Sequence, residues 1–92
     1  MKIKELLSDP SKWTQGKIAR DSSMNEIHPN DPQAVCWCLI GAVRKCYPGH
    51  YDYENLCKRI VEQTKEEFLF NWNDSPTTTF SDVKSLVEEL DI

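Results

Sequence analysis

Apolar residues recur every three to four positions along several stretches of the chain, the spacing that is typical of helices burying one face. Ile3, Leu6 and Leu7 predict a short N-terminal helix. Three longer stretches predict the main helices, at residues 33–46, 53–67 and 80–90. The pattern therefore predicts a mainly α, small helical domain of three main helices plus the short N-terminal helix.

The stretch 33–46 is the predicted centre of this domain. Asp31 suits a helix N-cap and Pro32 suits the first helical position. Residues 34–43 are apolar on nearly every side, which is typical of a helix buried all round. The predicted inward stripe consists of Val35, Cys38, Leu39, Ala42, Val43 and Cys46. Gly41 costs about 1 kcal/mol against Ala in a helix, so we expect another segment to approach closely there.

The segments between these helices carry turn and cap signals. Asp9 and Pro10 predict a second short turn through Trp13. Residues 17–20 and 26–28 flank turn-forming residues and predict a minor β-hairpin. Thr79 and Asp82 predict a capping box before the last helix.

Two further segments depend on the same kind of signal. Asp52 predicts the cap of the helix at 53–67. Residues 68–76 combine aromatic side chains with the loop chemistry of Asn-Asp-Ser-Pro. We therefore expect an ordered loop there, held down by Phe70 and Trp72.

Length and charge narrow the class of protein. A chain of 92 residues fits a single domain, residues 1–92, and its 39% of hydrophobic residues suffices for a core. The net charge is −4 and Lys and Arg are scattered, so no nucleic-acid partner is expected. The N-terminal apolar run is short and broken by Glu5, and no stretch reaches membrane-spanning length. We expect a small soluble cytoplasmic protein without a membrane partner.

Four cysteines are expected to be free thiols, because a reducing compartment disfavours disulfides. On a helix, Cys36 and Cys38 would point about 200° apart, which prevents a bridge or a shared metal ion. Cys36 near a helix start, with His28 or His50 as base and Asp74 behind it, is a weak candidate nucleophile, since no protease signature surrounds it. We expect no catalytic residue, no metal and no cofactor, although an enzymatic role stays open.

Three blocks of sequence carry a family resemblance. They are W-x-Q-G-x-x-A-R-D from Trp13, W-C-L-x-G-A from Trp37 and W-N-D-x-P-x-T from Trp72. Together they resemble an uncharacterised family, a domain of unknown function, of small bacterial and phage proteins, over residues 6–90. The resemblance implies a helical fold and a phage or mobile-element setting, and it implies no activity. Such proteins often carry glycine in the turn where this chain has Met24.

The polar residues of these blocks are the candidate ligand-binding residues. The set comprises Trp13, Gln15, Arg20, Asp21, Trp37, Asn73 and Asp74. In one interpretation, loops 13–21 and 72–78 form a pocket over the central helix, where Arg20 binds an anion and Asp74 positions it. In the other, Arg20 pairs with Asp74 and Asn73 caps backbone groups, so that both loops are locked in place. We favour the second interpretation, because structural ion pairs resemble sites.

Three functional hypotheses follow. The leading one is a non-enzymatic protein-binding or accessory protein, phage- or mobile-element-encoded, whose partner is a protein. The alternative is a small-ligand or enzymatic pocket at the two loops. The third is a structural protein that forms a homodimer.

Overall fold

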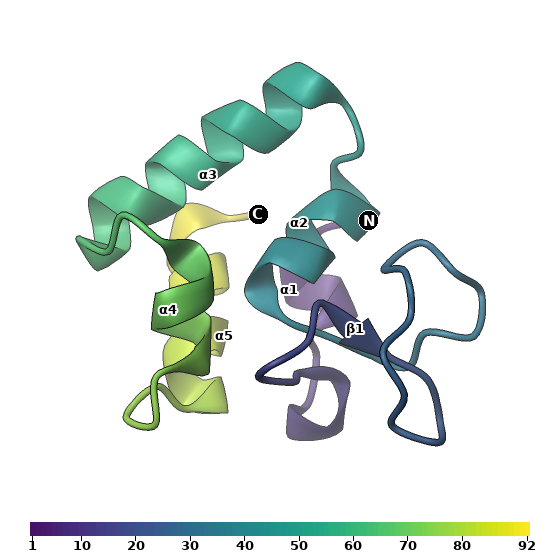
Figure 1. Cartoon of the computed structure of the whole chain (residues 1–92). Coiled ribbons are helices and arrows are strands. Elements are labelled where there is room, and N and C mark those ends of the chain that lie inside the picture. The colour runs from purple at the N-terminus through teal and green to yellow at the C-terminus, as the bar shows by residue number, and fades with distance from the viewer.

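Helices dominate the computed structural model, which describes residues 1–92 (Figure 1). The chain runs through α1 (Ile3–Leu6), the 3-10 turn η1 (Pro10–Lys12), β1 (Ala19–Arg20), β2 (Cys36–Trp37), α2 (Leu39–Cys46), α3 (His50–Thr64), α4 (Leu69–Asp74) and α5 (Phe80–Leu90). The two short strands pair antiparallel. The predicted mainly α domain is confirmed.

The cap signals at η1 and α5 are confirmed in the structure. The Asp9 side chain accepts a hydrogen bond from the Ser11 backbone N–H at 2.9 Å and so caps η1. At α5, the Asp82 N–H donates to the Thr79 hydroxyl at 3.3 Å, and the Thr79 N–H donates to Asp82 Oδ2 at 2.9 Å. These signals succeed because both partners lie within three residues of each other.

The central helix begins at Leu39, six residues later than the sequence pattern predicts. Cys38 is its N-cap, and the Cys38 sulfur accepts from the Gly41 N–H at 3.3 Å. Asp31 instead closes a local turn by accepting from the Gln33 N–H at 2.9 Å. The predicted inward position of Val35 is wrong, since 44% of this residue is exposed.

Residues 36–37 are extended because β1 takes them as its strand partner. Ala19 pairs with Trp37 and Arg20 pairs with Cys36. The hairpin predicted at 17–28 is therefore only partly correct. Arg20 does bridge to Glu26, but the regular strand partner of β1 comes from residues 36–37.

The helices around α2 also differ from the predicted boundaries. Helix α3 starts at His50 behind Gly49 as N-cap, so Asp52 lies in the first turn and does not cap it. Residues 69–74 form α4, where the sequence predicted a loop. Phe70 is 47% exposed and does not anchor this segment, whereas Trp72 is half-buried.

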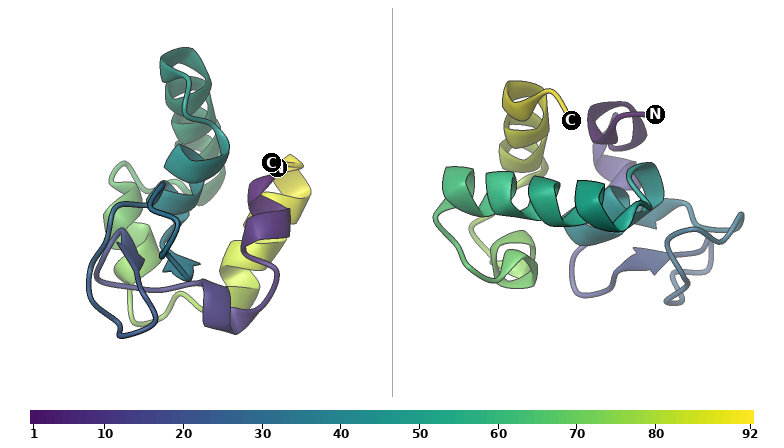
Figure 2. Two further views of the ribbon diagram at one scale, coloured as in Figure 1. Left: turned by 90° about the vertical axis from the view of Figure 1, so that its right-hand side faces the viewer. Right: turned by 90° about the horizontal axis from the view of Figure 1, so that it is seen from above.

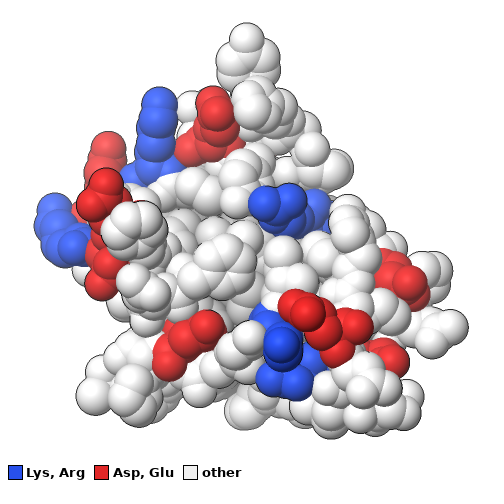
Figure 3. Space-filling model, in the orientation of Figure 1, with Lys and Arg blue, Asp and Glu red and all other residues white.

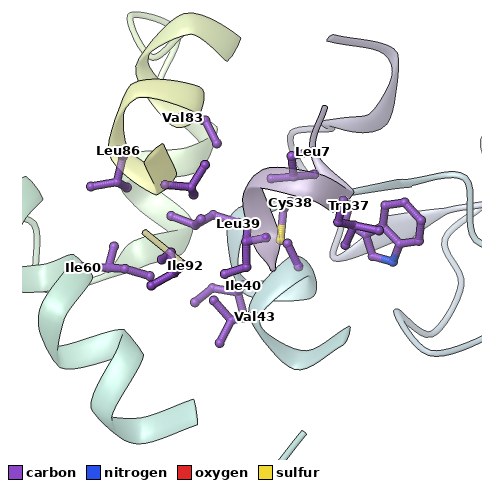
Figure 4. Packing of buried hydrophobic residues seen from close by; sticks show 14 of the residues in the cluster. Leu7, Trp37, Cys38, Leu39, Ile40, Val43, Ile60, Val83, Leu86 and Ile92 are labelled. Carbon is purple, nitrogen blue, oxygen red and sulfur yellow. The ribbon is translucent and has the colours of Figure 1, made fainter. Parts of the chain in front are cut away.

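The core lies where α2 meets the surrounding helices. Figure 4 shows Leu39 and Val43 of α2 close to Ile60 and Ile92, with Val83 and Leu86 on α5. Leu39, Val43 and Ile60 are fully buried. A Cβ added to Gly41 would lie 2.1 Å from the Ile18 carbonyl oxygen, which confirms the predicted close approach.

The two ends of the chain meet on one side of the domain. Figure 2 shows α3 lying across the other helices and both termini side by side. The Lys4 N–H donates to the Ile92 carbonyl at 3.0 Å, and Ile92 is buried in the core. None of the helices is both long and apolar enough to cross a bilayer.

Candidate functional site

Asn73 is the centre of the predicted polar constellation, and it is fully buried at the end of α4. Its side-chain oxygen accepts from Trp13 Nε1 at 2.7 Å and from the Leu39 N–H at 3.0 Å. Its amide nitrogen donates to the Thr14 carbonyl at 3.1 Å and to Asp74 Oδ1 at 2.9 Å. Asn73 thus joins the 13–21 loop, the first turn of α2 and the C-terminal end of α4.

Gln15 and Gly16 complete the link between the two loops. The Gln15 amide nitrogen donates to the carbonyls of Asn73 at 2.8 Å and Ser75 at 3.0 Å. The Gly16 N–H donates to Asp74 Oδ1 at 2.9 Å, in a turn where Gly16 has φ +85°. Backbone groups at the ends of short helices need such partners when water is excluded.

Arg20 does not form the pair with Asp74 that the favoured interpretation predicted. Its guanidinium donates to the Thr14 hydroxyl at 2.9 Å, to the Gln15 carbonyl at 3.1 Å and to the Met24 carbonyl at 3.0 Å. Arg20 therefore organises the 14–24 loop from within. The Asp74 carboxylate instead accepts hydrogen bonds from the Gly16 N–H and from the side-chain amide of Asn73.

Trp37 and Asp21 have separate structural partners. Trp37 Nε1 donates to the Pro29 carbonyl at 2.9 Å. Asp21 is outside the constellation and accepts from the Ser23 and Asn25 N–H groups, both at 3.0 Å, within its own turn. No buried side-chain nitrogen or oxygen lacks a hydrogen-bond partner.

We call Trp13, Thr14, Gln15, Arg20 and Asn73 the polar clamp. The structure brings Trp13, Gln15, Asn73 and Asp74 together, with Arg20 one step further along the same loop. None of the four cavities is lined by any of the seven predicted site residues. The geometry favours a structural role for these residues, because their polar groups are hydrogen-bonded to one another.

The structure does not place Cys36 where the nucleophile hypothesis required it. Cys36 lies in β2 and not in a first helical turn, so the helix dipole that the nucleophile hypothesis needs is missing there. Burial raises the pKa of the Cys38 thiol, of the Cys57 thiol and of the Cys46 thiol, the last to about 11. No group of three or more His, Cys, Asp or Glu side chains has an arrangement that could hold a metal ion.

A groove on another part of the surface was not predicted. A cavity of about 380 Å³ is lined by His28, Asn30, Arg44, Tyr47, Tyr53 and Glu54, together with Pro48 and His50. A second hollow of about 340 Å³ shares His28 and Arg44 with it and adds Ile18, Glu26, Ile27 and Pro29. We call the two together the Arg44 groove.

The polar groups of this groove are arranged by short-range contacts. The Asn30 N–H donates to His28 Nδ1 at 3.1 Å, which leaves the Nε2–H of a neutral imidazole as a donor. The Arg44 guanidinium lies 5.1 Å from the centre of the Tyr53 ring. Desolvation raises the pKa of Tyr53, so its hydroxyl keeps its proton.

The sequence contains one feature that indicates the groove, although the spacing of apolar residues does not reveal its position. Residues 47–53 concentrate three tyrosines and a histidine at the junction of two helices. His28 and Arg44 come from other segments, so only the fold brings them to this junction.

These features define a small helical domain built on a polar clamp. The chain belongs to DUF6197, a family of unknown function, whose match covers residues 1–90. The family resemblance predicted from the three tryptophan blocks is confirmed at this level. No curated protein and no solved structure matches the chain.

Proposed function

We propose that this protein is a non-enzymatic binding or accessory protein that acts by engaging a protein partner. The observation that carries the proposal is the contrast between its two polar regions. The clamp residues satisfy one another, whereas Arg44 in the surface groove has no acidic partner. Charges on two interacting protein surfaces are arranged to complement one another, so an unpaired cation in a groove suits a partner that presents an acidic group.

The exposed aromatic side chains support the same proposal. Tyr51 is 79% exposed, Phe68 is 63% exposed and Phe70 is 47% exposed. Aromatic residues are enriched in protein interfaces, where they bury a large area at a small entropic cost. Thiols whose pKa values are raised make poor nucleophiles, which counts against Cys38, Cys46 and Cys57 in such a role.

The cellular setting is proposed on separate grounds. Four free cysteines fit a reducing compartment, so we propose a cytoplasmic protein. The phage or mobile-element origin rests on the family resemblance alone. A homodimer remains the competing arrangement, and sedimentation of the purified chain across a concentration series distinguishes it from a hetero-complex.

The proposal is tested by capture of the tagged full chain from the cells that encode it. We expect one protein to be retained in a near-stoichiometric amount and to bind the purified chain directly. The control is Leu39→Asp, which places a charge in the core and unfolds the domain. A protein retained equally by this control is a chaperone, and failure of every retained protein to bind the purified chain would refute the proposal.

A further inference from the structure

A third hollow, of about 330 Å³, lies where the C-terminal end of α3 meets α4 and α5. Figure 1 shows α4 and α5 below the C-terminal half of α3. The lining includes Thr64 at the end of α3, Trp72 on α4 and one face of α5 that carries Asp82, Leu86 and Glu89. We call this hollow the Trp72 groove.

The charge of the Trp72 groove has one sign. Its two ionisable side chains are the carboxylates of Asp82 and Glu89, and no lysine, arginine or histidine lines it. The basic residues closest to it along the chain lie outside the lining: Lys84 pairs with Glu88 at 3.9 Å, Arg59 donates to the Leu90 carbonyl at 2.8 Å, and Lys65 is exposed. Figure 3 shows basic and acidic atoms beside one another along α3, so the neighbouring surface is mixed in charge.

The end of α3 strengthens this negative field. Thr64 is the last residue of a helix of 15 residues, and the last turn of that helix contains no basic residue. The free carbonyl groups at a helix C-terminus carry a partial negative charge, which favours a cation nearby. The groove is therefore complementary to a positively charged group.

Glu89 and Trp72 have polar atoms that the fold does not use. Glu89 has no ion pair, whereas Asp82 Oδ2 accepts from the Thr79 N–H at 2.9 Å. The indole N–H groups of the other two tryptophans donate within the protein, but that of Trp72 does not. Since every buried side-chain nitrogen has a partner, the Trp72 N–H reaches the surface.

The spacing along α5 selects the kind of cation. Asp82 and Glu89 are seven residues apart, which is about 10.5 Å along a helix axis. One metal ion binds its oxygen ligands at about 2–2.6 Å and cannot bridge that distance. The apolar side chain of Leu86 lies between the two carboxylates in the sequence, so the groove suits a long side chain with an apolar stem and a cationic head.

Arginine matches these features better than lysine. A guanidinium is flat and weakly hydrated, so it stacks on an aromatic ring such as that of Trp72. Its edge forms two parallel hydrogen bonds with a carboxylate that has both oxygens free, as Glu89 has. The ammonium group of lysine is a strongly hydrated point charge and makes neither contact as well.

We propose that the Trp72 groove binds an arginine side chain of the partner protein, with the guanidinium paired with Glu89 and the stem against Trp72 and Leu86. This inference rests on the proposed function and names one residue type that the partner presents. The net charge of −4 acts in the same direction, because it attracts a basic segment.

The test is a titration of the isotope-labelled full chain with acetyl-alanyl-arginyl-alanine amide. The comparison peptides replace arginine by citrulline, which has the same shape without the charge, and by lysine. We expect the arginine peptide to bind about five- to twentyfold more tightly than the citrulline peptide, and more tightly than the lysine peptide. The indole N–H resonance of Trp72 should shift, while those of Trp13 and Trp37, which are hydrogen-bonded inside the fold, should stay in place.

Variants separate the role of Glu89 from a general effect of charge. Glu89→Gln should remove the preference for arginine over citrulline. Glu62→Gln removes the same charge from an exposed position of α3 that does not line the groove, and should keep the preference. Trp72→Leu should remove the preference for arginine over lysine, because that preference depends on stacking. Both glutamates are exposed, so unchanged melting temperatures verify folding of their variants.

The inference is wrong if the citrulline or lysine peptide binds as tightly as the arginine peptide, or if Glu89→Gln keeps the preference. It is also wrong if Mg²⁺ alone shifts the Trp72 resonance as far as the arginine peptide does. Its failure differs from failure of the proposed function. A captured partner that binds Glu89→Gln as tightly as the unaltered chain refutes the groove assignment and leaves a protein-binding role intact.

Discussion

The indole N–H of Trp13 donates to the buried side-chain oxygen of Asn73 at 2.7 Å, across sixty residues of sequence. The same oxygen accepts from the Leu39 N–H at the start of α2. One amide group therefore fixes where the N-terminal loop, the central helix and α4 meet. Two of the residues that carry the family resemblance, Trp13 and Asn73, thus hold parts of the fold together.

Replacing Asn73 by Ala is expected to destabilise the protein by at least about 2–3 kcal/mol, because it leaves several buried partners unpaired. These include the Trp13 indole, the Leu39 N–H and the Thr14 carbonyl. Urea titration of the free energy of unfolding measures the loss. Asn71→Ala, at an exposed position of the same helix, should stay within about 0.5 kcal/mol. Equal effects of the two changes would contradict the clamp.

Gly41→Ala is expected to destabilise the protein by at least about 1–3 kcal/mol, although Ala is the better helix former. The added Cβ would lie 2.1 Å from the Ile18 carbonyl oxygen, and a backbone atom cannot move aside cheaply. Gly49→Ala is the comparison variant and should cost less, because its Cβ would meet only the Asp52 carboxylate at 3.3 Å and only the N-cap preference for glycine is lost. A neutral or stabilising Gly41→Ala would mean that the Ile18 backbone does not lie against α2.

Met24 has φ +66°, a left-handed conformation that glycine adopts without strain. Related proteins were expected to carry glycine in this turn. Met24→Gly should therefore raise the melting temperature by about 2–8 °C, the shift that about 0.5–1 kcal/mol gives in a domain of this size. The bond from Arg20 Nη1 to the residue 24 carbonyl is retained, since it involves only backbone at that position. Ser23→Gly is the control, because Ser23 is outside the left-handed region and its replacement should not raise the melting temperature. If both variants raised the melting temperature equally, the backbone conformation of Met24 would not be the cause.

Local signals in the sequence predicted the ends of α5 and η1 correctly. Each depends on a side chain and a backbone N–H that lie two or three residues apart, as with Thr79 and Asp82. The core of α2 was predicted in the same way, from the spacing of Leu39, Ala42 and Val43.

The start of α2 and the existence of α4 could not be predicted in this manner. Asp31 followed by Pro32 is a signal shared by helix caps and isolated turns, and pairing with β1 decides between them here. Helix α4 is six residues long and is held in place by the Asn73 side chain, whose partners are far away in sequence. The Arg44 groove has the same origin, since His28, Arg44 and Tyr53 come from three segments.

The ion pairs at the joined termini predict a loss of stability in acid. The Asp91 carboxylate accepts from Lys2 at 2.8 Å and from Lys4 at 2.5 Å, and these bonds lower the pKa of Asp91 to about 2 from its ordinary value of 3.8. A lowered folded-state pKa means that the pairs stabilise the fold above the ordinary value, and this stabilisation disappears as the pH falls towards 2. Urea unfolding of the unaltered chain should therefore show a midpoint that falls between pH 5 and pH 2.

Asp91→Asn isolates this contribution, because Asn tolerates the left-handed backbone at φ 54°. The variant should unfold at a lower urea concentration than the unaltered chain near neutral pH. This difference between the two unfolding midpoints should disappear in acid. Glu67→Gln, which changes an exposed carboxylate outside the helices and without an ion pair, should leave a parallel curve. A constant gap for Asp91→Asn at every pH would show that the pairs do not matter. High salt should narrow the gap, because both lysines are on the surface.

Arg20→Ala distinguishes a structural guanidinium from a binding one. The change removes donors to the Thr14 hydroxyl, the Gln15 carbonyl and the Met24 carbonyl, so we expect a loss of about 1–3 kcal/mol in the free energy of unfolding. Arg20→Lys should not restore it, because one ammonium group cannot reach three acceptors that point in different directions. Full stability of Arg20→Ala, combined with loss of a captured partner, would instead move the binding surface from the Arg44 groove to the 13–21 loop.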